Sequence, residues 1–143
     1  MKRIFCDTSF LFALRNVRDE HHEQARRVLE ERLVEIYPAV HFVITDYIFD
    51  ETVTILSRKA GKTVALETVR YLYGPDFKLE FIGEKLFMEA LTVFTQYQDK
   101  RWSFTDCTSY VWIKHSSPDY VLATDQNFSE FGLPAPNLMK EVS

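Results

Sequence analysis

The sequence predicts an α/β protein, and we expect a three-layer α/β/α sandwich around a central, mostly parallel sheet of four to five strands. Short apolar stretches, each suited to a buried strand, alternate along the chain with longer segments whose apolar residues recur at helical spacing. Such alternation is typical of parallel sheets with helices on both faces. The chain has 143 residues, of which 46% are apolar and 27% charged, so we expect one globular domain over residues 1–143.

The first half of the chain contains two predicted strands and four predicted helices. The strands are short apolar stretches, and the helices begin at a Ser, Thr or polar residue and end near a glycine or proline. In order, we expect a strand at 3–6, a helix capped by Thr8 or Ser9 and running through Leu14, a helix at 22–33, a strand at 42–44, a helix at 46–60 capped by Thr45 and stopped by Gly61, and a helix from Thr63 that ends before Gly74.

The second half continues the alternation. Its longest helix has a clear amphipathic pattern, with Leu86, Phe87, Ala90, Leu91 and Phe94 at helical spacing. In order, we expect a strand at 79–82, a helix at 84–97, a helix at 103–115, a strand at 120–123 that ends at the segment TDQN, and a short last strand at 137–142.

Charge and cysteine content narrow the class of protein. The formal net charge is -4, without the basic surplus usual in nucleic-acid-binding proteins, although a local basic patch can oppose the total. Only Cys6 and Cys107 are present, too few for a disulfide scaffold, which indicates a reducing compartment. Asp7 interrupts the apolar start, and no uncharged run reaches the ~20 residues needed to cross a bilayer. We expect a cytoplasmic protein without a membrane segment.

Four acidic residues lie among apolar neighbours. Asp7 directly follows the first predicted strand and Asp125 the strand at 120–123, and parallel sheets bind ligands at the carboxyl ends of their strands. Glu51 shares the apolar face of its predicted helix. Asp106 lies near the start of the helix at 103–115. These positions predict one cluster of carboxylates at an edge of the sheet.

Local structure offers another explanation for three of the four acids. Asp7 can cap the helix that follows it, Ser103 and Asp106 have the spacing of a capping box, and Asp125 can form an Asx-turn after its strand. Glu51 has no such role, because it lies in the middle of its helix. The agreement of all four positions favours a functional site over four separate structural roles.

A cluster of carboxylates requires a counter-charge. Carboxylates brought together without cations raise their own pKa values and destabilise the fold. A divalent metal removes this conflict, and a set of hard oxygen ligands suits Mg²⁺ or Mn²⁺ rather than Zn²⁺. Two such ions ~3.5–4 Å apart can activate water and stabilise the leaving oxygen in phosphodiester hydrolysis. The predicted chemistry is therefore metal-dependent hydrolysis of a phosphodiester.

Four segments, taken in order, resemble the PIN-domain family. They are FCDTSFLFAL, TDYIFDETVTIL, WSFTDCTSYV and LATDQNFSEFG. The resemblance runs from Ile4 to about Gly132 and is greatest to the VapC-type branch, the toxin ribonucleases of toxin–antitoxin pairs. Each piece alone is weak, whereas the ordered set with this spacing is fairly specific.

The resemblance implies a function and a set of site residues. It implies a Mg²⁺- or Mn²⁺-dependent endoribonuclease that cleaves single-stranded or structured RNA by in-line attack of water, leaving a 5′-phosphate and a 3′-hydroxyl. It also implies a homodimer and a small antitoxin partner. By matching position, the metal-binding and catalytic residues would be Asp7, Glu51, Asp106 and Asp125, with Ser9 and Thr124 as supporting polar residues.

Four basic residues near the predicted site are candidates to bind RNA phosphates. Arg15 and Arg18 follow the first helix, and Lys100 and Arg101 precede the segment with Asp106. The alternative is that they are ordinary surface cations of an acidic protein.

Other functions remain open at this point. An aspartyl-nucleophile phosphatase needs a second acid where this chain has Ser9, and a receiver domain needs paired acids and a late lysine that are not evident. A PIN-domain nuclease of RNA maturation or decay without a toxin role remains an alternative. A non-catalytic RNA- or protein-binding module is the alternative from another class.

Overall fold

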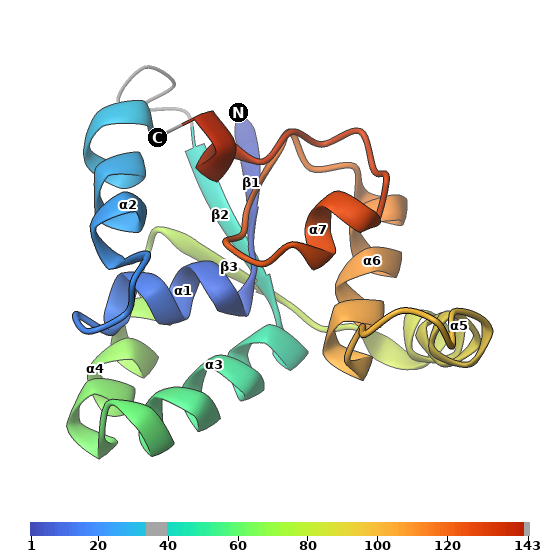
Figure 1. Cartoon of the computed structure of the whole chain (residues 1–143), viewed down its shortest axis with the longest axis horizontal. Coiled ribbons are helices and arrows are strands. Elements are labelled where there is room, and N and C mark those ends of the chain that lie inside the picture. Colours follow the sequence, from blue (N-terminus) through green and yellow to red (C-terminus); the bar gives the residue numbers. More distant parts are fainter. Residues whose placement is uncertain (34–39, 142–143) are drawn as a thin grey trace.

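The computed structural model describes residues 1–33 and 40–141, and helices and strands alternate within this part of the chain (Figure 1). Its strands are β1 (Lys2–Cys6), β2 (Val40–Thr45), β3 (Phe77–Glu80) and β4 (Tyr120–Leu122). Its α-helices are α1 (Thr8–Arg15), α2 (His22–Arg27), α3 (Asp46–Lys59), α4 (Lys62–Leu72), α5 (Gly83–Gln96), α6 (Phe104–Ser116) and α7 (Asn127–Glu130). A π-helical turn, η1 (Val28–Arg32), extends α2, and a 3₁₀ turn, η3 (Leu138–Glu141), follows the last loop.

The strands form one parallel sheet in the order β3-β2-β1-β4. The chain begins at β1, adds β2 and then β3 on one side, and returns through α5 and α6 to place β4 on the other side of β1. The direction of winding therefore changes between β1 and β4. At such a switch point the loops after the two strands diverge and leave a crevice at the carboxyl edge of the sheet.

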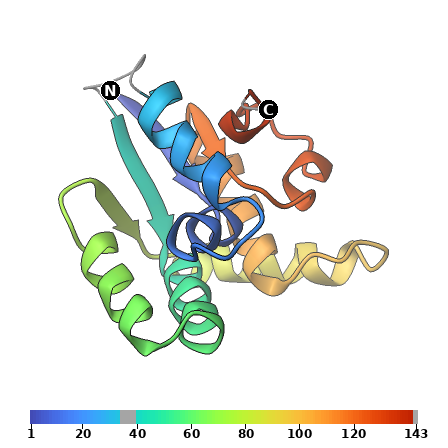
Figure 2. The ribbon, with the colours of Figure 1, turned by 60° about the vertical axis from the view of Figure 1, so that its left-hand side comes forward.

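Apolar side chains cover both faces of the sheet. On one face Phe5 stacks on Trp112 of α6 and Phe128 of α7, with ring centroids 5.4 and 6.1 Å away. On the other, Phe77 contacts Phe42 and Tyr71 of α4. Figure 1 accordingly shows the sheet between α1, α2 and α4 on its left and α5, α6 and α7 on its right, and Figure 2 shows the same layers from a second side. The predicted three-layer α/β/α sandwich is confirmed.

Several predicted helix boundaries are found in the structure. The Thr45 hydroxyl accepts a hydrogen bond from the Ile48 N–H and caps α3. Gly61, with φ of 100°, ends that helix in a conformation that favours glycine. Ser103 and Asp106 form the complete capping box of α6.

Two predicted strands are wrong. The third strand lies at 77–80 rather than 79–82, because Phe77 pairs with Phe42 and Ile82 instead donates its N–H to Asp46 at the start of α3. The last strand at 137–142 is absent from the described residues. Asn137 makes one isolated bridge to Val121 before η3 begins, and residue 142 lies outside the described part.

The sequence left the cap of the first helix open among Asp7, Thr8 and Ser9. Asp7, and not Thr8 or Ser9, is the N-cap of α1, and its carboxylate accepts the N–H of Ser9. The aspartate is therefore both the last residue before the helix and the first residue beyond β1. None of the described helices is long and apolar enough to cross a membrane.

Candidate active site

Four carboxylates line one cleft of about 370 Å³ at the carboxyl edge of the sheet. They come from four separate segments of the chain, and three of those segments are the loop after β1, the start of α6 and the loop after β4. The fourth is the middle of α3. The acids that line the cleft are Asp7, Glu51, Asp106 and Asp125. The cleft thus lies at the switch point between β1 and β4 and contains all four predicted acids.

Ser9 holds Asp7 in place and joins the two strands of the switch point. Its hydroxyl lies 2.6 Å from Oδ2 of Asp7, and its N–H donates to the same oxygen at 3.1 Å. The same hydroxyl accepts the backbone N–H groups of Thr124 and Asp125, at 3.0 and 3.3 Å. One side chain therefore fixes the residue after β1 and the backbone after β4 relative to each other.

Asn127 connects two further acids of the cleft. Its side-chain amide donates to Oδ2 of Asp106 at 3.0 Å, and its backbone N–H donates to Oδ1 of Asp125 at 2.9 Å. The second bond closes an Asx-turn, which is the local structure that Asp125 was expected to form. Asp106 also accepts the N–H of Ser103 in the capping box of α6.

Local structural roles and a place in the cleft therefore coexist. Asp7, Asp106 and Asp125 each use one carboxylate oxygen to cap a helix or close a turn. In the described part of the chain the second oxygen of each accepts no hydrogen bond. Each aspartate is consequently fixed by one oxygen and has the other available for a ligand.

Glu51 differs from the three aspartates. It lies in the second turn of α3, where the intrahelical hydrogen bonds leave no backbone N–H for it to cap. A hydrogen bond from the side chain of Thr8 steadies its charged form. Thr8 is in turn 3.5 Å from the hydroxyl of Thr52, which lies one residue after Glu51 on α3. Glu51 is therefore the acid of the cleft for which local structure gives no reason.

Burial and mutual repulsion disfavour the charged forms of these acids. Burial raises the pKa of Asp7 to about 7, the Ser9 hydrogen bonds oppose this shift, and the charges of Asp106 and Glu51 add to it. Burial likewise raises the pKa of Glu51 and of Asp106, and in both cases neighbouring carboxylates contribute. The charged forms of Asp7, Glu51 and Asp106 are thus disfavoured unless a positive charge lies nearby.

The donor set fits a hard divalent cation. The cleft offers carboxylate oxygens and no thiol or imidazole, which is the chemistry that Mg²⁺ and Mn²⁺ prefer over Zn²⁺. Among residues 1–33 and 40–141, however, no three His, Cys, Asp or Glu side chains form a ready-made metal site. Within these residues the donor atoms of the cleft thus fit such a cation by their chemistry, while their spacing is not that of a formed metal site.

The other predicted residues are divided between the cleft and other surfaces. Arg101 lines the cleft. Thr124 contributes its backbone N–H to Ser9, and its side chain does not line the cleft. Lys100 is 3.5 Å from Glu130 in an ion pair and lies in a different hollow. Arg15 and Arg18 line a further hollow at the other end of α1.

Two residues of the cleft were not singled out from the sequence. Asn127 and Thr8 both line it, the first beside Asp106 and the second beside Glu51. The D-x-N spacing after β4 was a usable signal for Asn127, because an Asx-turn brings residue i+2 back to the aspartate. Thr8 carried no such signal, because its contact with Glu51 depends on how α1 packs on α3.

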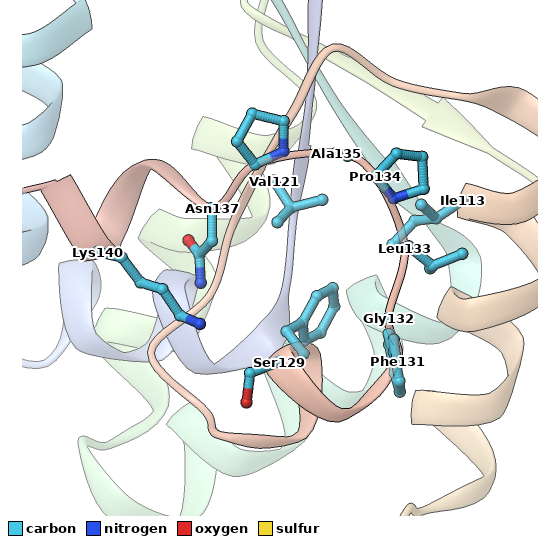
Figure 3. A pocket seen from close by; sticks show the side chains of 12 residues that line it. Ile113, Val121, Ser129, Phe131, Gly132, Leu133, Pro134, Ala135, Asn137 and Lys140 are labelled. Atoms are coloured by element: carbon cyan, nitrogen blue, oxygen red, sulfur yellow. The ribbon is translucent and has the colours of Figure 1, made fainter.

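A larger cavity lies elsewhere and does not have the acidic lining of the cleft. It has a volume of about 400 Å³, lies between α7, α6 and the loop before η3, and has no acid in its lining (Figure 3). Its polar groups largely serve the fold: Asn137 exchanges hydrogen bonds with the backbone of Ala123, and Ser129 donates to the Gln126 carbonyl. Lys140 is its one charged residue. We therefore assign the chemistry to the smaller acidic cleft.

Comparison with known proteins identifies the family of the fold. The family model of the PIN domain matches residues 4–133. The 23S rRNA-specific endonuclease VapC20 of Mycobacterium tuberculosis is 27% identical over 129 residues, which cover 90% of this chain and 94% of that relative. The crystal structure of the same M. tuberculosis protein, described as a sarcin–ricin loop cleaving toxin, superposes with a TM-score of 0.80 at 26% identity and covers 91% of this chain and 95% of that one.

A more distant structure shares the fold. FitAcB from Neisseria gonorrhoeae superposes with a TM-score of 0.63 at 14% identity, covering 97% of this chain and 99% of that one. The four-stranded parallel sheet and its helical layers are therefore common to proteins whose sequences have diverged widely.

Proposed function

This chain belongs to the PIN-domain family, and we propose that it is a metal-dependent endoribonuclease and the toxin of a toxin–antitoxin pair. The similarity to VapC20, an rRNA-specific endonuclease, extends over nine-tenths of the chain and supports this proposal. The observation that carries it is the acidic cleft, in which Asp7, Glu51, Asp106 and Asp125 converge from segments far apart in the sequence.

The four carboxylates are the residues that would hold Mg²⁺ or Mn²⁺. Such ions, when bound, lower the pKa of water and neutralise the charge that develops on the leaving oxygen of a phosphodiester. The raised pKa of Asp7 supports this assignment, because a buried and repelled carboxylate gains most from a nearby cation. Ser9 and Asn127 would keep the aspartates in position while the metal binds.

The remaining residues of the cleft suggest separate tasks. Glu51 is unconstrained by any cap or turn, so it is best suited to accept a proton from the attacking water or to orient it. Arg101 is the cation of the cleft and would bind a phosphate next to the scissile bond. Cleavage by an in-line attack of water leaves a 5′-phosphate and a 3′-hydroxyl on the two RNA products.

We also propose a homodimer, a small antitoxin partner and a cytoplasmic location. Exposed apolar side chains on α5, namely Phe87, Met88, Leu91 and Phe94, support pairing of two copies. Both cysteines are free and buried, which agrees with a reducing compartment. Light scattering after size-exclusion chromatography tests the dimer, and a Leu91→Glu variant should be monomeric if α5 forms its interface.

The enzymatic proposal is tested by RNA cleavage. The purified protein is incubated with a panel of labelled single-stranded and stem-loop RNAs in Mn²⁺, in Mg²⁺ and in EDTA. We expect cleavage in the metal-containing reactions, products with 5′-phosphates, and loss of cleavage in EDTA and in Asp106→Asn. Asp50→Asn is the matched control, because Asp50 is an exposed acid that directly precedes Glu51 in α3. RNA binding without cleavage under all conditions would favour the non-catalytic alternative.

A further inference from the structure

A second hollow lies at the far ends of the two helices that carry Asp7 and Glu51. It has a volume of about 260 Å³ and is formed by the end of α1, the loop after it, the end of α3 and the start of α4. Its charged lining residues are Arg15, Arg18 and Lys59, and no acid lines it. In a protein with a net charge of -4, three cations around one hollow form a local basic patch.

The spacing between cleft and hollow is set by the helices. Arg15 follows Asp7 by eight residues along α1, and Lys59 follows Glu51 by eight residues along α3. At 1.5 Å of rise per residue, each cation is about 12 Å from its acid along the helix axis. Both helices start at the carboxyl edge of the sheet and run towards α4 (Figure 1), so the two hollows lie in line along the same pair of helices.

The cations of the hollow differ in how they are held. Arg15 is fixed, because its Nε donates to Thr68 at 3.1 Å, its guanidinium lies 5.4 Å from the ring centroid of Tyr71, and it is 3.7 Å from Glu67. Arg18 and Lys59 are exposed, and within residues 1–33 and 40–141 neither side chain has a hydrogen bond or an ion pair. Two of the three positive charges are therefore available to a ligand.

Helix electrostatics explains only part of this arrangement. A cation in the last turn of a helix is favoured by the helix dipole, which accounts for Arg15 in α1 and Lys59 in α3. Arg18 lies beyond the end of α1 and gains nothing from that dipole. Arg18 therefore adds a positive charge to the hollow that the dipoles of α1 and α3 do not explain.

We propose that this basic hollow binds backbone phosphates of the RNA strand whose scissile bond lies in the acidic cleft. The proposal rests on the proposed ribonuclease function, because the strand that the hollow binds is defined as the one that is cleaved in the acidic cleft. Even at the roughly 3.4 Å of axial rise per nucleotide of a duplex strand, the 12 Å between them is at most about three to four nucleotides, and a more extended single strand spans it with fewer. An acidic protein segment is the other class of ligand for such a patch, but alignment with the cleft along α1 and α3 favours the RNA strand.

The test compares a hollow variant with a charge-matched control in a protein that binds RNA without cutting it. In an Asp106→Asn background, Arg18→Gln with Lys59→Gln is compared with Lys114→Gln with Lys140→Gln, whose exposed cations line neither the cleft nor the basic hollow. The affinity for a labelled 12-nucleotide single-stranded RNA is measured between 50 and 200 mM salt. The melting temperature of each variant is measured alongside, because a purely structural role would appear there.

The hollow variant should bind the RNA about tenfold more weakly at 50 mM salt than the control does. Its plot of log affinity against log salt should be shallower by about 1.4, because each phosphate contact on a single strand contributes about 0.7 to that slope. Equal affinity and equal slope for the two double variants would overturn the proposal, as would weaker RNA binding with no change in slope. Loss of affinity for polyglutamate without loss for RNA would assign the hollow to a protein ligand instead.

Kinetics separates this proposal from the ribonuclease proposal. With Asp106 intact and Mn²⁺ present, Arg18→Gln with Lys59→Gln should raise KM for the 12-nucleotide RNA about tenfold and leave kcat unchanged. A two-nucleotide substrate, which spans only the cleft, should show no change in KM. If the unmodified chain cleaves no RNA but the hollow variant still weakens binding, the ribonuclease proposal fails and the phosphate site stands.

Discussion

The hydroxyl of Ser9 lies 2.6 Å from Oδ2 of Asp7 and donates a hydrogen bond to it. The same oxygen atom of Ser9 accepts the N–H of Thr124 from the far side of the switch point. A side chain of two heavy atoms thus joins the ends of β1 and β4 and fixes one carboxylate oxygen, leaving the other available to a ligand. This pairing has a measurable consequence for both stability and activity.

Replacing Ser9 by alanine should lower both the stability of the fold and the rate of RNA cleavage. The backbone N–H groups of Thr124 and Asp125 lose their acceptor, so we expect a loss of about 1–3 kcal/mol in the free energy of unfolding. RNA cleavage should fall roughly 10–100-fold, as is usual when a group that orients a metal ligand is removed. Urea unfolding and steady-state cleavage measure the two effects. Ser9→Thr keeps the hydroxyl and should restore most of each, so equal defects in both variants would contradict this role.

Neutralising Asp7 should stabilise the metal-free protein at neutral and higher pH. The pKa of Asp7 is raised from 3.8 to about 7 in the folded protein, so the folded state binds more protons than the unfolded state between these values. Stability in EDTA should therefore fall as the pH rises from about 4 to 7 and level off above that. Asp7→Asn carries no such charge, and asparagine can still cap α1. We expect it to be more stable than the unmodified chain at pH 8, by on the order of a few kcal/mol.

The comparison at pH 4 serves as the control for Asp7. Both proteins are uncharged at this position there, so the gain in stability from Asp7→Asn should largely disappear. Chemical unfolding in EDTA at several pH values provides the measurement. A stability difference that does not change with pH would show that Asp7 is not strained by burial and repulsion.

Glu51→Gln should strongly reduce cleavage without weakening the fold. The side chain has no cap or turn to maintain, and its charge is disfavoured by burial and by Asp106 and Asp125. We expect cleavage to fall by roughly 10²–10⁴-fold, the range typical of a lost general base, with an unchanged or higher melting temperature. Asp50→Asn removes a charge one residue away on an exposed face and should change cleavage less than twofold. Similar losses in the two variants would exclude a specific role for Glu51.

Mn²⁺ should stabilise the unmodified chain by mass action. A metal at about one hundred times its dissociation constant adds about 2.7 kcal/mol to the free energy of unfolding. The rise in melting temperature should be absent from the double variant Asp7→Asn with Asp106→Asn, which keeps both caps and removes two carboxylates of the cleft. Differential scanning fluorimetry with Mn²⁺ and with EDTA measures it. An equal rise in both proteins would place the metal outside the cleft.

Asn127→Ala tests a residue that was found only in the structure. Its amide holds Asp106 at 3.0 Å, so we expect cleavage to fall about tenfold and the effect to appear chiefly in the Mn²⁺ concentration required. Gln126→Ala, at the exposed neighbouring position, is the control and should behave as the unmodified chain does. Normal metal dependence in Asn127→Ala would show that Asp106 needs no support from this side chain.

The sequence was most informative where one residue type has one structural use. Apolar stretches followed by an acid located the ends of β1 and β4, and Thr45 and Ser103 marked the starts of α3 and α6. The positions of the four acids relative to these elements predict that they lie close together, and all four line the same cleft. A local structural role and a place in the cleft do not exclude each other, because a carboxylate has two oxygens. Each of the three aspartates uses only one of them for a cap or a turn.

What the sequence did not determine depends on packing between distant segments. The strand at 77–80 is fixed by the ring of Phe77 against Phe42 and Tyr71, contacts that no local pattern reveals. The segment from Asn137 is apolar enough for a strand, but the side chain of Asn137 exchanges hydrogen bonds with the backbone of Ala123 and the chain turns into η3. The roles of Thr8 and Asn127 are likewise set by neighbours from other elements.

The insertion of β4 last beside β1 also determines when during synthesis the acidic cleft can first exist. Asp7 leaves the ribosome before Asp125 is made, because Asp125 and the strand that positions it follow 118 residues later. At about 5–20 residues per second, this interval lasts roughly 6–24 s. A nascent chain therefore carries an incomplete set of carboxylates throughout this interval, and the polysome that makes this protein is not exposed to a finished cleft while it lasts.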